Sequence, residues 1–421
     1  MPDGSSSDPG RTGVKRRGFL GSALLAGSAV IAGALSRTTL SEAAEAVAER
    51  PRELGAPLSP YGTPSQYEKN VVRVPTGLTP TKLSSWDFTP LQDLHGIITP
   101  NGLFFERNHA GVPAIDPATH RLLIHGLVDN PRTLSMADLK RYPPVSAIHF
   151  LECSGNGLTE WAKPTEKTVQ LTHGLVSCVE WTGVKVSTIL NDIGVKSGAA
   201  WVLAEGADAA LLDRSIPLDK MMDDAILVYA QNGEALRPEQ GYPLRLLLPG
   251  FEGNMNIKWL RRLKVGREPF YTREETSKYT DLLETGSARM FTFVMEAKSV
   301  ITQPSGGMQT VGKGPRTISG LAWSGRGKVV RVEVSTDGGK VWNTARLQEP
   351  ILSKSLTRFV YPWKWTGAEA VLQSRCHDET GYVQPTLAGL VKARGLNSVY
   401  HLNGIQSWHV ASDGTVTNVH A

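Results

Sequence analysis

The chain has 421 residues, which is enough for two domains of ordinary size with substantial cores. Its 45 lysines and arginines and 40 aspartates and glutamates give a formal charge of +5, too small and too scattered to indicate a nucleic-acid-binding protein. Its three cysteines, Cys153, Cys178 and Cys376, exclude a disulfide framework, and none lies in a CxxC or CxxCH motif typical of zinc or attached haem.

Residues 1–46 are typical of a twin-arginine signal peptide. Arg16 and Arg17 precede an apolar run, residues 21–35, that is rich in glycine and alanine. The run is short and polar residues follow it, which favours a cleaved export signal over an uncleaved membrane anchor. We therefore expect a periplasmic or otherwise exported protein that has no integral membrane segment after signal removal.

The next two segments are predicted to be an arm and a mixed α/β domain. Residues 47–95 contain seven prolines and indicate a loop-rich arm. Within residues 96–285, short apolar strands alternate with short helices, but without the regular period of a doubly wound sheet. No GxGxxG or Walker A motif is present, so no nucleotide site is predicted. The strands are predicted at residues 122–126, 145–150, 201–204, 225–230 and 244–249, and the helices at 136–141 and 184–193.

Residues 286–421 are predicted to form a β-sandwich. Residues 329–335 alternate between apolar and polar side chains, residues 336–339 form a hairpin turn, and Val341 begins the return strand. The strand spacing is immunoglobulin-like, although the Cys–Trp–Cys signature is missing. The expected fold class is therefore α+β, with a mixed α/β domain followed by an immunoglobulin-like β-sandwich.

Cys153 lies where a predicted strand meets a glycine-rich turn, residues 153–157. A thiolate is a soft ligand that suits transition metals. A single cysteine beside a turn is nevertheless more often buried and inert, so this turn alone does not indicate a metal site.

Four motifs in order resemble those of the sulfite oxidase family of molybdenum enzymes. They are Arg107-Asn108-His109, the CSGN stretch at residues 153–156, the NGE and GYPLR stretches at residues 232–234 and 241–245, and residues 253–259. The resemblance covers about residues 95–415 and implies a C-terminal dimerisation domain. Within the family, residues 273–281 and 378–385 are most similar to the molybdenum subunit of bacterial sulfane dehydrogenases of the Sox sulfur-oxidation system.

The resemblance implies a role for each matching residue. Cys153 would bind molybdenum, and Arg107 and Tyr279 would act with it as catalytic residues. Arg245 and Lys258 suit a phosphate dianion, which favours fixed cations. The implied cofactor is one molybdenum–molybdopterin per chain, with no haem in this chain. The residues implied to hold it are Arg107, Asn108, His109, Cys153, Asp208, Gln240, Arg245, Asn256, Ile257 and Lys258, of which Gln240 replaces a family histidine.

The sequence departs from sulfite-oxidising relatives where they carry further basic residues. Gly157, Leu158 and Val410 occupy those positions. Since clustered arginines suit a small free oxyanion, their loss favours sulfur that is bound to a carrier protein. The implied partners are a sulfur-carrier protein, a c-type cytochrome subunit that accepts electrons, and a second copy of the chain in a homodimer.

Two other functions remain open on the sequence alone. One is a sulfite dehydrogenase that acts on free sulfite, and the other is a secreted, non-catalytic β-sandwich binding protein. Taken singly, Arg107 and Arg245 also suit surface ion pairs, His109 a hydrogen-bonded polar residue, and Tyr279 a loop cap. Molybdenum content separates the binding protein from either enzyme.

The signal predicts a specific export defect. Replacing both arginines, Arg16→Lys and Arg17→Lys, should leave folded precursor in the cytoplasm, because the twin-arginine pathway requires the pair. Cell fractionation and immunoblotting would measure this. Normal accumulation of the double variant outside the cytoplasm would rule out the twin-arginine assignment.

Overall fold

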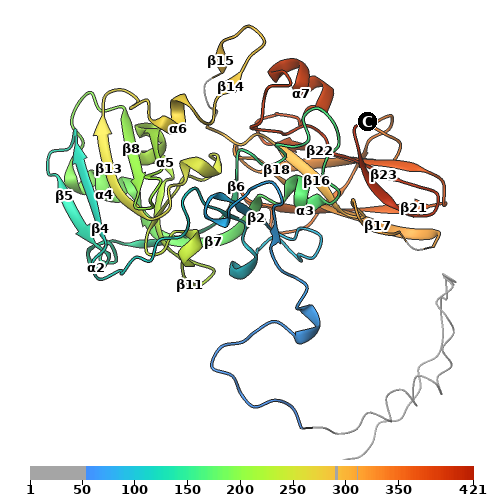
Figure 1. Cartoon of the computed structure of the whole chain (residues 1–421), viewed down its shortest axis with the longest axis horizontal. Helices are drawn as coiled ribbons and strands as arrows, with labels where there is room; N and C mark the ends of the chain where they lie inside the picture. The colour runs from blue at the N-terminus through green and yellow to red at the C-terminus, as the bar shows by residue number, and fades with distance from the viewer. Residues whose placement is uncertain (1–53, 290–292, 311) are drawn as a thin grey trace, which may run out of the picture. The chain divides into compact units, whose positions relative to one another are not determined.

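The computed structural model describes residues 54–289, 293–310 and 312–421, so the predicted signal peptide lies outside the described residues. Contacts divide the chain into two units, Met1–Thr63 and Pro64–Ala421. All of the helices and strands described below belong to the second unit (Figure 1). No helix in the described part of the chain is both long and apolar enough to cross a membrane.

The proline-rich segment contributes two strands to a small antiparallel sheet. β1 (Val74–Pro75) pairs with β2 (Trp86–Phe88), which pairs with β3 (Glu106–Arg107). Short 3-10 helices lie between these strands: η1 (Gln66–Glu68), η2 (Lys82–Ser84) and η3 (Asn101–Leu103). The sheet places Trp86 directly opposite Arg107, so the segment supports a predicted site residue.

Two sheets form the α/β domain, an antiparallel one and a mixed one in which β4 and β13 are parallel. The first has the order β11-β10-β7-β6, with β12 also paired to β10, and the second has the order β5-β4-β13-β8-β9. The first sheet comprises β6 (Pro144–Glu152), β7 (Val176–Lys185), β10 (Ile226–Gln231), β11 (Glu234–Ala235) and β12 (Arg245–Leu247). The second comprises β4 (Arg121–Gly126), β5 (Arg132–Ser135), β8 (Trp201–Gly206), β9 (Asp213–Pro217) and β13 (Leu260–Gly266).

Short helices accompany these sheets, and α4 shows how the sequence specifies them. α4 (Val186–Ile193) buries Val186, Ile189, Leu190 and Ile193, the 3.6-residue spacing of an apolar helix face. It begins two residues later than predicted because β7 continues to Lys185. The other helices are α2 (Met136–Leu139), α3 (Val169–His173), α5 (Leu218–Asp223), α6 (Arg273–Thr276), η4 (Pro238–Gln240) and η5 (Gly253–Met255).

The C-terminal region is a β-sandwich, as predicted. One sheet has the order β16-β17-β21-β20 and the other β19-β18-β22-β23-β24, and every pairing is antiparallel. The first sheet contains β16 (Lys298–Gln303), β17 (Gly314–Trp323), β20 (Arg346–Leu347) and β21 (Thr357–Trp365). The second contains β18 (Val329–Ser335), β19 (Asn343–Thr344), β22 (Ala370–Asp378), β23 (Ser407–Val410) and β24 (Val416–Val419).

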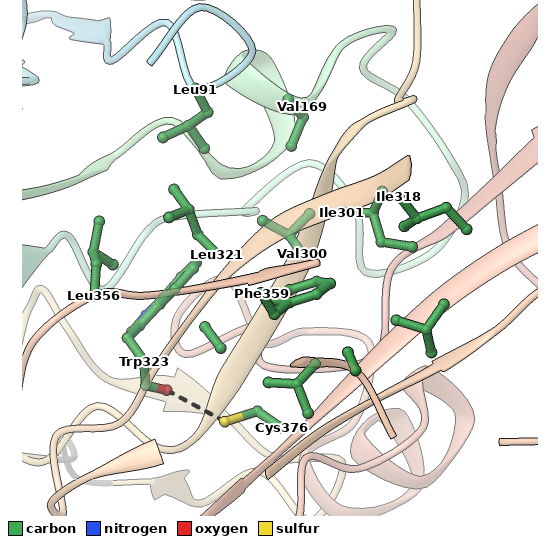
Figure 2. Packing of buried hydrophobic residues seen from close by; sticks show 14 of the residues in the cluster. Leu91, Val169, Val300, Ile301, Ile318, Leu321, Trp323, Leu356, Phe359 and Cys376 are labelled. Carbon is green, nitrogen blue, oxygen red and sulfur yellow. Dashed lines mark hydrogen bonds between the residues drawn. The ribbon is translucent and has the colours of Figure 1, made fainter. Parts of the chain in front are cut away.

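Side chains from both sheets fill the sandwich core (Figure 2). Trp323 and Phe359 are fully buried there, and Cys376 lies among them with its sulfur 4.0 Å from the Trp323 carbonyl oxygen. Cys178 is equally buried, in the α/β domain. Cys376 and Cys178 therefore act as small core residues, whereas Cys153 is only partly buried.

Two features of this region differ from the sequence prediction. The return strand β19 begins at Asn343 rather than Val341 and has only two residues. The segment between β22 and β23 forms a helix, α7 (Leu387–Arg394), in which Leu390 and Arg394 are the buried residues. Because α7 buries so little of one face, its sequence lacks the apolar period that reveals a helix. A short hairpin, β14 (Asp281–Leu282) with β15 (Ala288–Arg289), lies beside α7 (Figure 1), and Arg289 donates to the Ala393 carbonyl.

A buried ion pair joins the two domains next to the predicted metal ligand. Lys298 at the start of β16 pairs with Glu152, the last residue of β6, at 2.5 Å, and both side chains are essentially inaccessible. The Trp323 indole donates to the second Glu152 oxygen at 2.6 Å. The residue before Cys153 is thus fixed by two side chains of the sandwich.

Removing one member of this pair should destabilise the protein strongly. Lys298→Met leaves the Glu152 carboxylate buried without its cation, which should cost about 3–5 kcal/mol of unfolding free energy. The double change Glu152→Gln with Lys298→Met should cost less than Lys298→Met alone, because no buried charge remains. Chemical denaturation measures all three proteins.

The matched control is the surface pair Arg132–Asp192, whose side chains are 41% and 44% exposed. Arg132→Met should cost about 1 kcal/mol or less, because exposed ion pairs contribute little. Equal losses for Lys298→Met and Arg132→Met would contradict the structural role given to the buried pair.

Candidate active site

An inner cavity brings together nearly all of the predicted site residues. They come from β3 and the loop after it, the Cys153 turn, the loop between β8 and β9, residues 240–258, and the segment after α6. Ile257 is the exception, because its side chain is fully buried in the core of the α/β domain. The predicted residues that line the cavity are Arg107, Asn108, His109, Cys153, Asp208, Gln240, Arg245, Asn256, Lys258 and Tyr279.

Hydrogen bonds hold the Cys153 turn against the end of β7. The Cys153 amide donates to the Leu175 carbonyl at 3.0 Å, and the Asn156 side chain both donates to Glu152 and accepts from the Leu175 amide. A side chain at Gly253 would lie 2.8 Å from the Glu152 carbonyl oxygen, so only glycine lets η5 pack here. Burial raises the pKa of the Cys153 thiol, and a backbone hydrogen bond from Gly155 and the charge of Arg107 partly offset this rise.

His109 and Tyr279 form a neutral hydrogen-bonded pair at the cavity. His109 Nε2 lies 3.0 Å from Tyr279 Oη. Burial, together with nearby cations of which Arg107 is the strongest, lowers the pKa of His109 to about 3. Burial, with a smaller contribution from Cys153, raises the pKa of Tyr279 well above its ordinary value. At neutral pH the pair therefore consists of an imidazole and a phenol, and either can donate the shared proton.

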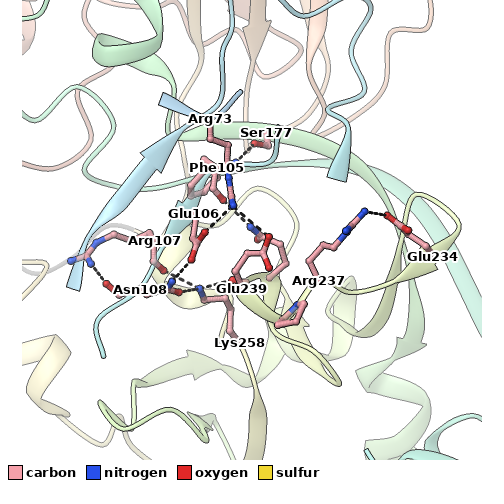
Figure 3. A network of polar contacts seen from close by, with 12 residues as sticks. Arg73, Phe105, Glu106, Arg107, Asn108, Ser177, Glu234, Arg237, Glu239 and Lys258 are labelled. Atoms are coloured by element: carbon pink, nitrogen blue, oxygen red, sulfur yellow. Dashed lines mark hydrogen bonds and ion pairs between the residues drawn. The ribbon is translucent and has the colours of Figure 1, made fainter. Parts of the chain in front are cut away.

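Arg245 is fully buried and Lys258 is partly buried, and both line the inner cavity. Figure 3 shows Lys258 among Arg107, Asn108 and Glu239, and its Nζ donates to the carbonyls of Arg107 and Glu239, each at 2.9 Å. Arg245 donates to the Gln240 and Asn256 carbonyls and lies over the Trp181 ring. Burial lowers the pKa of Arg245 to about 9, and burial beside Arg245 lowers the pKa of Lys258 to about 7.

An outer cavity of about 590 Å³ opens next to the inner one and shares Arg107, His109, Cys153 and Tyr279 with it. Arg273, Lys278 and Tyr400 also line the outer cavity. None of these three residues was predicted from the sequence to have a role. Arg273 and Lys278 could have been identified from residues 273–281, which resemble the sulfane dehydrogenase subgroup of the family. Tyr400 comes from the sandwich domain and had no comparable signal.

The structure also places the three positions where basic residues are missing. Gly157 has φ +91°, and a Cβ there would lie 2.5 Å from Leu402 Cδ2, so a longer side chain would displace Leu402. Leu158 lines the outer cavity. Val410 lies in β23 within the sandwich core, so the expectation that position 410 bears on substrate charge is not supported.

Comparisons with known proteins agree with this architecture. Residues 109–274 match the oxidoreductase molybdopterin binding domain, and residues 289–407 match the Mo-co oxidoreductase dimerisation domain. Sulfite oxidase from Gallus gallus is 31% identical over 339 residues, which cover 74% of this chain and 72% of that protein. The chain belongs to the sulfite oxidase family. This membership confirms the predicted fold class.

Two further relatives, one matched by sequence and one by structure, are similar to this chain over most of its length. Mitochondrial sulfite oxidase from Mus musculus is 32% identical over 341 residues, and the match covers 74% of this chain but only 62% of that protein. The crystal structure of the sulfane dehydrogenase SoxCD from Paracoccus pantotrophus superposes with a TM-score of 0.86 at 49% identity. That superposition covers 88% of this chain and 96% of the other.

The inner cavity fits the molybdenum–molybdopterin cofactor that the family implies. The acceptors around Arg245 and Lys258, within the described residues, are neutral oxygen atoms, and Arg245 Nε has no partner there. Burying a cation without a neighbouring anion is energetically unfavourable. An anionic phosphate would therefore supply the missing counter-charge for both Arg245 and Lys258. Cys153 faces the same cavity and offers the thiolate that a soft metal requires.

The low pKa of Lys258 predicts how the stability of the cofactor-free protein depends on pH. The folded-state value of about 7 lies below the value of about 10.4 for an unfolded chain, so between them the unfolded state binds more protons. Unfolding free energy should therefore rise, relative to Lys258→Met, as the pH increases from about 7 to about 9. Urea denaturation of both proteins across this range is the measurement. The exposed Lys364 provides the control, and Lys364→Met should show no such trend. A pH-independent difference for Lys258→Met would refute the prediction.

Proposed function

We propose that the chain is the molybdenum subunit of an exported sulfane dehydrogenase. It oxidises sulfane sulfur on a carrier protein and passes the electrons to a c-type cytochrome subunit. The observation that carries this proposal is the large, cation-lined outer cavity directly in front of Cys153. Similarity to the sulfane dehydrogenase SoxCD over nearly its whole structure supports the same assignment.

One molybdenum–molybdopterin per chain would occupy the inner cavity. When bound, it supplies two-electron oxidation coupled to oxygen-atom transfer. Cys153 holds the metal, while Arg245 and Lys258 hold the phosphate. Asn108, His109, Asp208, Gln240, Asn256 and the backbone of Ile257 complete the set proposed to contact the pterin.

Arg107, Tyr279 and His109 act on the substrate side of the cavity. Arg107 is fixed by stacking over the Trp86 ring and by donation to the Ser85 carbonyl, so its charge is held in place for an anionic sulfur group. The Tyr279 phenol stays protonated and donates a hydrogen bond to substrate oxygen or sulfur. Neutral His109 shares a hydrogen bond with Tyr279 Oη and orients it whenever substrate is absent.

The shape and charge of the outer cavity favour a carrier-bound substrate. A volume of about 590 Å³ is typical of sites for extended ligands and far exceeds the size of sulfite. Arg273 and Lys278 stand at this wider opening, and Leu158 lies beside Cys153. A carrier segment gains binding energy from contacts remote from its sulfur, which replaces the close cation cluster that a free oxyanion needs.

Oxidation of free sulfite is the second candidate. Arg107, Arg273 and Lys278 all line one cavity, and each charge-assisted contact to a dianion contributes about 1.5–3 kcal/mol. Assembly follows the family in either case, because the sandwich matches a dimerisation domain and most soluble homo-oligomers have two-fold symmetry. We propose a homodimer to which the cytochrome subunit is added.

The substrate assignment is tested by comparing kcat/KM for a persulfidated carrier protein and for sulfite, with the same cytochrome acceptor. The carrier should be preferred, and Arg273→Ala with Lys278→Ala should lower its kcat/KM about threefold to tenfold, because rim charges contribute modestly. The exposed Arg141, which lies outside the cavity, gives the control Arg141→Ala, which should have no effect. Preference for sulfite would establish the second candidate instead.

The metal assignment is tested on the same preparations. Elemental analysis should find molybdenum in the wild-type protein, and Cys153→Ser should abolish oxidation of both substrates while the melting temperature stays close to wild type. Wild-type protein without molybdenum, when made in a molybdenum-replete host, would disprove the enzyme assignment and favour a binding protein.

A further inference from the structure

A four-residue segment of the sandwich domain, residues 398–401, crosses the edge of the outer cavity. We call it the strap. It follows α7, and its residues Val399 and Tyr400 line the cavity together with Lys278 and Tyr279 of the α/β domain. The strap lies within the residues that match a dimerisation domain, so a role in the active site is additional to that match.

One end of the strap is fastened by Asp281. This carboxylate is 4% exposed, and both of its oxygens accept hydrogen bonds from the strap. The Ser398 hydroxyl donates to Oδ2 and the Val399 amide donates to Oδ1, each at 3.1 Å, while Arg394 Nη1 lies 3.9 Å from Oδ2. Hydrogen bonds to a buried carboxylate are strong, so Asp281 ties the strap to the segment that carries Tyr279.

The other end of the strap is fastened to the Cys153 turn. The His401 amide donates to the Ser154 carbonyl at 2.8 Å, and His401 Nε2 lies 2.9 Å from the Glu252 carboxylate. Between the two ends, the Tyr400 ring lies 5.3 Å from the Tyr279 ring. The strap therefore links Tyr279 to the turn that presents Cys153.

Tyr279 requires such support because its backbone is in an unfavourable conformation. Its φ is +52°, in the left-handed region that bulky residues rarely occupy. The Arg214 guanidinium lies 5.2 Å from the ring centre, the Tyr400 ring packs against the ring, and His109 shares a hydrogen bond with the hydroxyl. Loss of the strap would remove one of these supports and let the phenol move.

We propose that Asp281 is a positioning residue, which acts through the strap to hold the Tyr279 phenol beside Cys153, so that the sandwich domain completes the active site. One part of this inference rests on the proposed function, namely that Tyr279 donates a hydrogen bond to the substrate. Asp281 itself does not line either cavity.

The decisive experiment is a double-mutant cycle on the molybdenum-loaded protein. Asp281→Ala should lower kcat about tenfold with KM within about twofold, because a small misplacement of an orienting group affects the chemical step. Asp281→Asn keeps an oxygen that accepts from Val399 and should restore most of kcat. Tyr279→Phe combined with Asp281→Ala should have the kcat of Tyr279→Phe alone, since Asp281 acts through the missing hydroxyl.

Asp378 provides the matched control for general destabilisation. Its buried carboxylate accepts from Ser324 and Thr380 within the sandwich. Asp378→Ala should lower the melting temperature and leave kcat unchanged. If Asp281→Ala yields no folded protein, Ser398→Ala removes one of the two strap hydrogen bonds and enters the same cycle.

Hydrogen exchange gives a second readout that does not depend on activity. In Asp281→Ala, the amides of residues 396–402 and of residues 277–280 should both exchange faster, and the Asp378→Ala protein should not show this pairing. The proposal would be overturned if the losses of kcat from Asp281→Ala and Tyr279→Phe multiply in the double variant. Faster exchange in only one of the two segments would also overturn it. If wild-type protein oxidises neither sulfur substrate, the proposed function fails. The paired hydrogen exchange still decides whether Asp281 couples the strap to the Tyr279 segment.

Discussion

The geometry of the site depends on the buried ion pair between Glu152 and Lys298. Glu152 ends β6 immediately before Cys153, and its carboxylate receives hydrogen bonds from Lys298, Trp323 and the Asn156 side chain. A carboxylate buried this deeply is tolerated only when its partners are in place. The observed form of the Cys153 turn therefore depends on correct docking of the sandwich domain, which couples folding of one domain to the proposed metal site of the other.

A second buried carboxylate, Glu252, repeats this arrangement on the other side of Cys153. It precedes Gly253, pairs with Arg214 of β9 and lies 2.9 Å from His401 of the sandwich. The two carboxylates are neutralised behind the turn, whereas the cavity in front of it is lined by Arg107, Arg245 and Lys258. Charge is thus separated across the Cys153 turn, and the open side is left positive for an anionic cofactor and substrate.

The same region places an apolar side chain beside the Cys153 turn. Leu402 fills the space next to Gly157, and the amide of the preceding residue, His401, donates to the Ser154 carbonyl. Cations are found instead at Arg273 and Lys278, on and just after α6. In the proposed function, cations at Arg273 and Lys278 in place of the Cys153 turn would replace close recognition of a small oxyanion by recognition of a larger, anionic partner surface.

The sequence by itself determined the order of the two domains, the sandwich and the members of the inner cavity, because each depends on local patterns or contiguous motifs. Periodicity revealed β18 and α4, and the motifs around Arg107, Cys153 and Arg245 identified residues that the fold then brought together. It did not reveal α7, whose buried face is too small to create a period. Only the tertiary structure decided that Tyr400 packs against Tyr279, that Val399 bonds to Asp281, that Lys298 supports Cys153, and that Val410 lies away from the site. These relationships join residues more than a hundred positions apart or depend on which way a strand faces, and no local pattern encodes either.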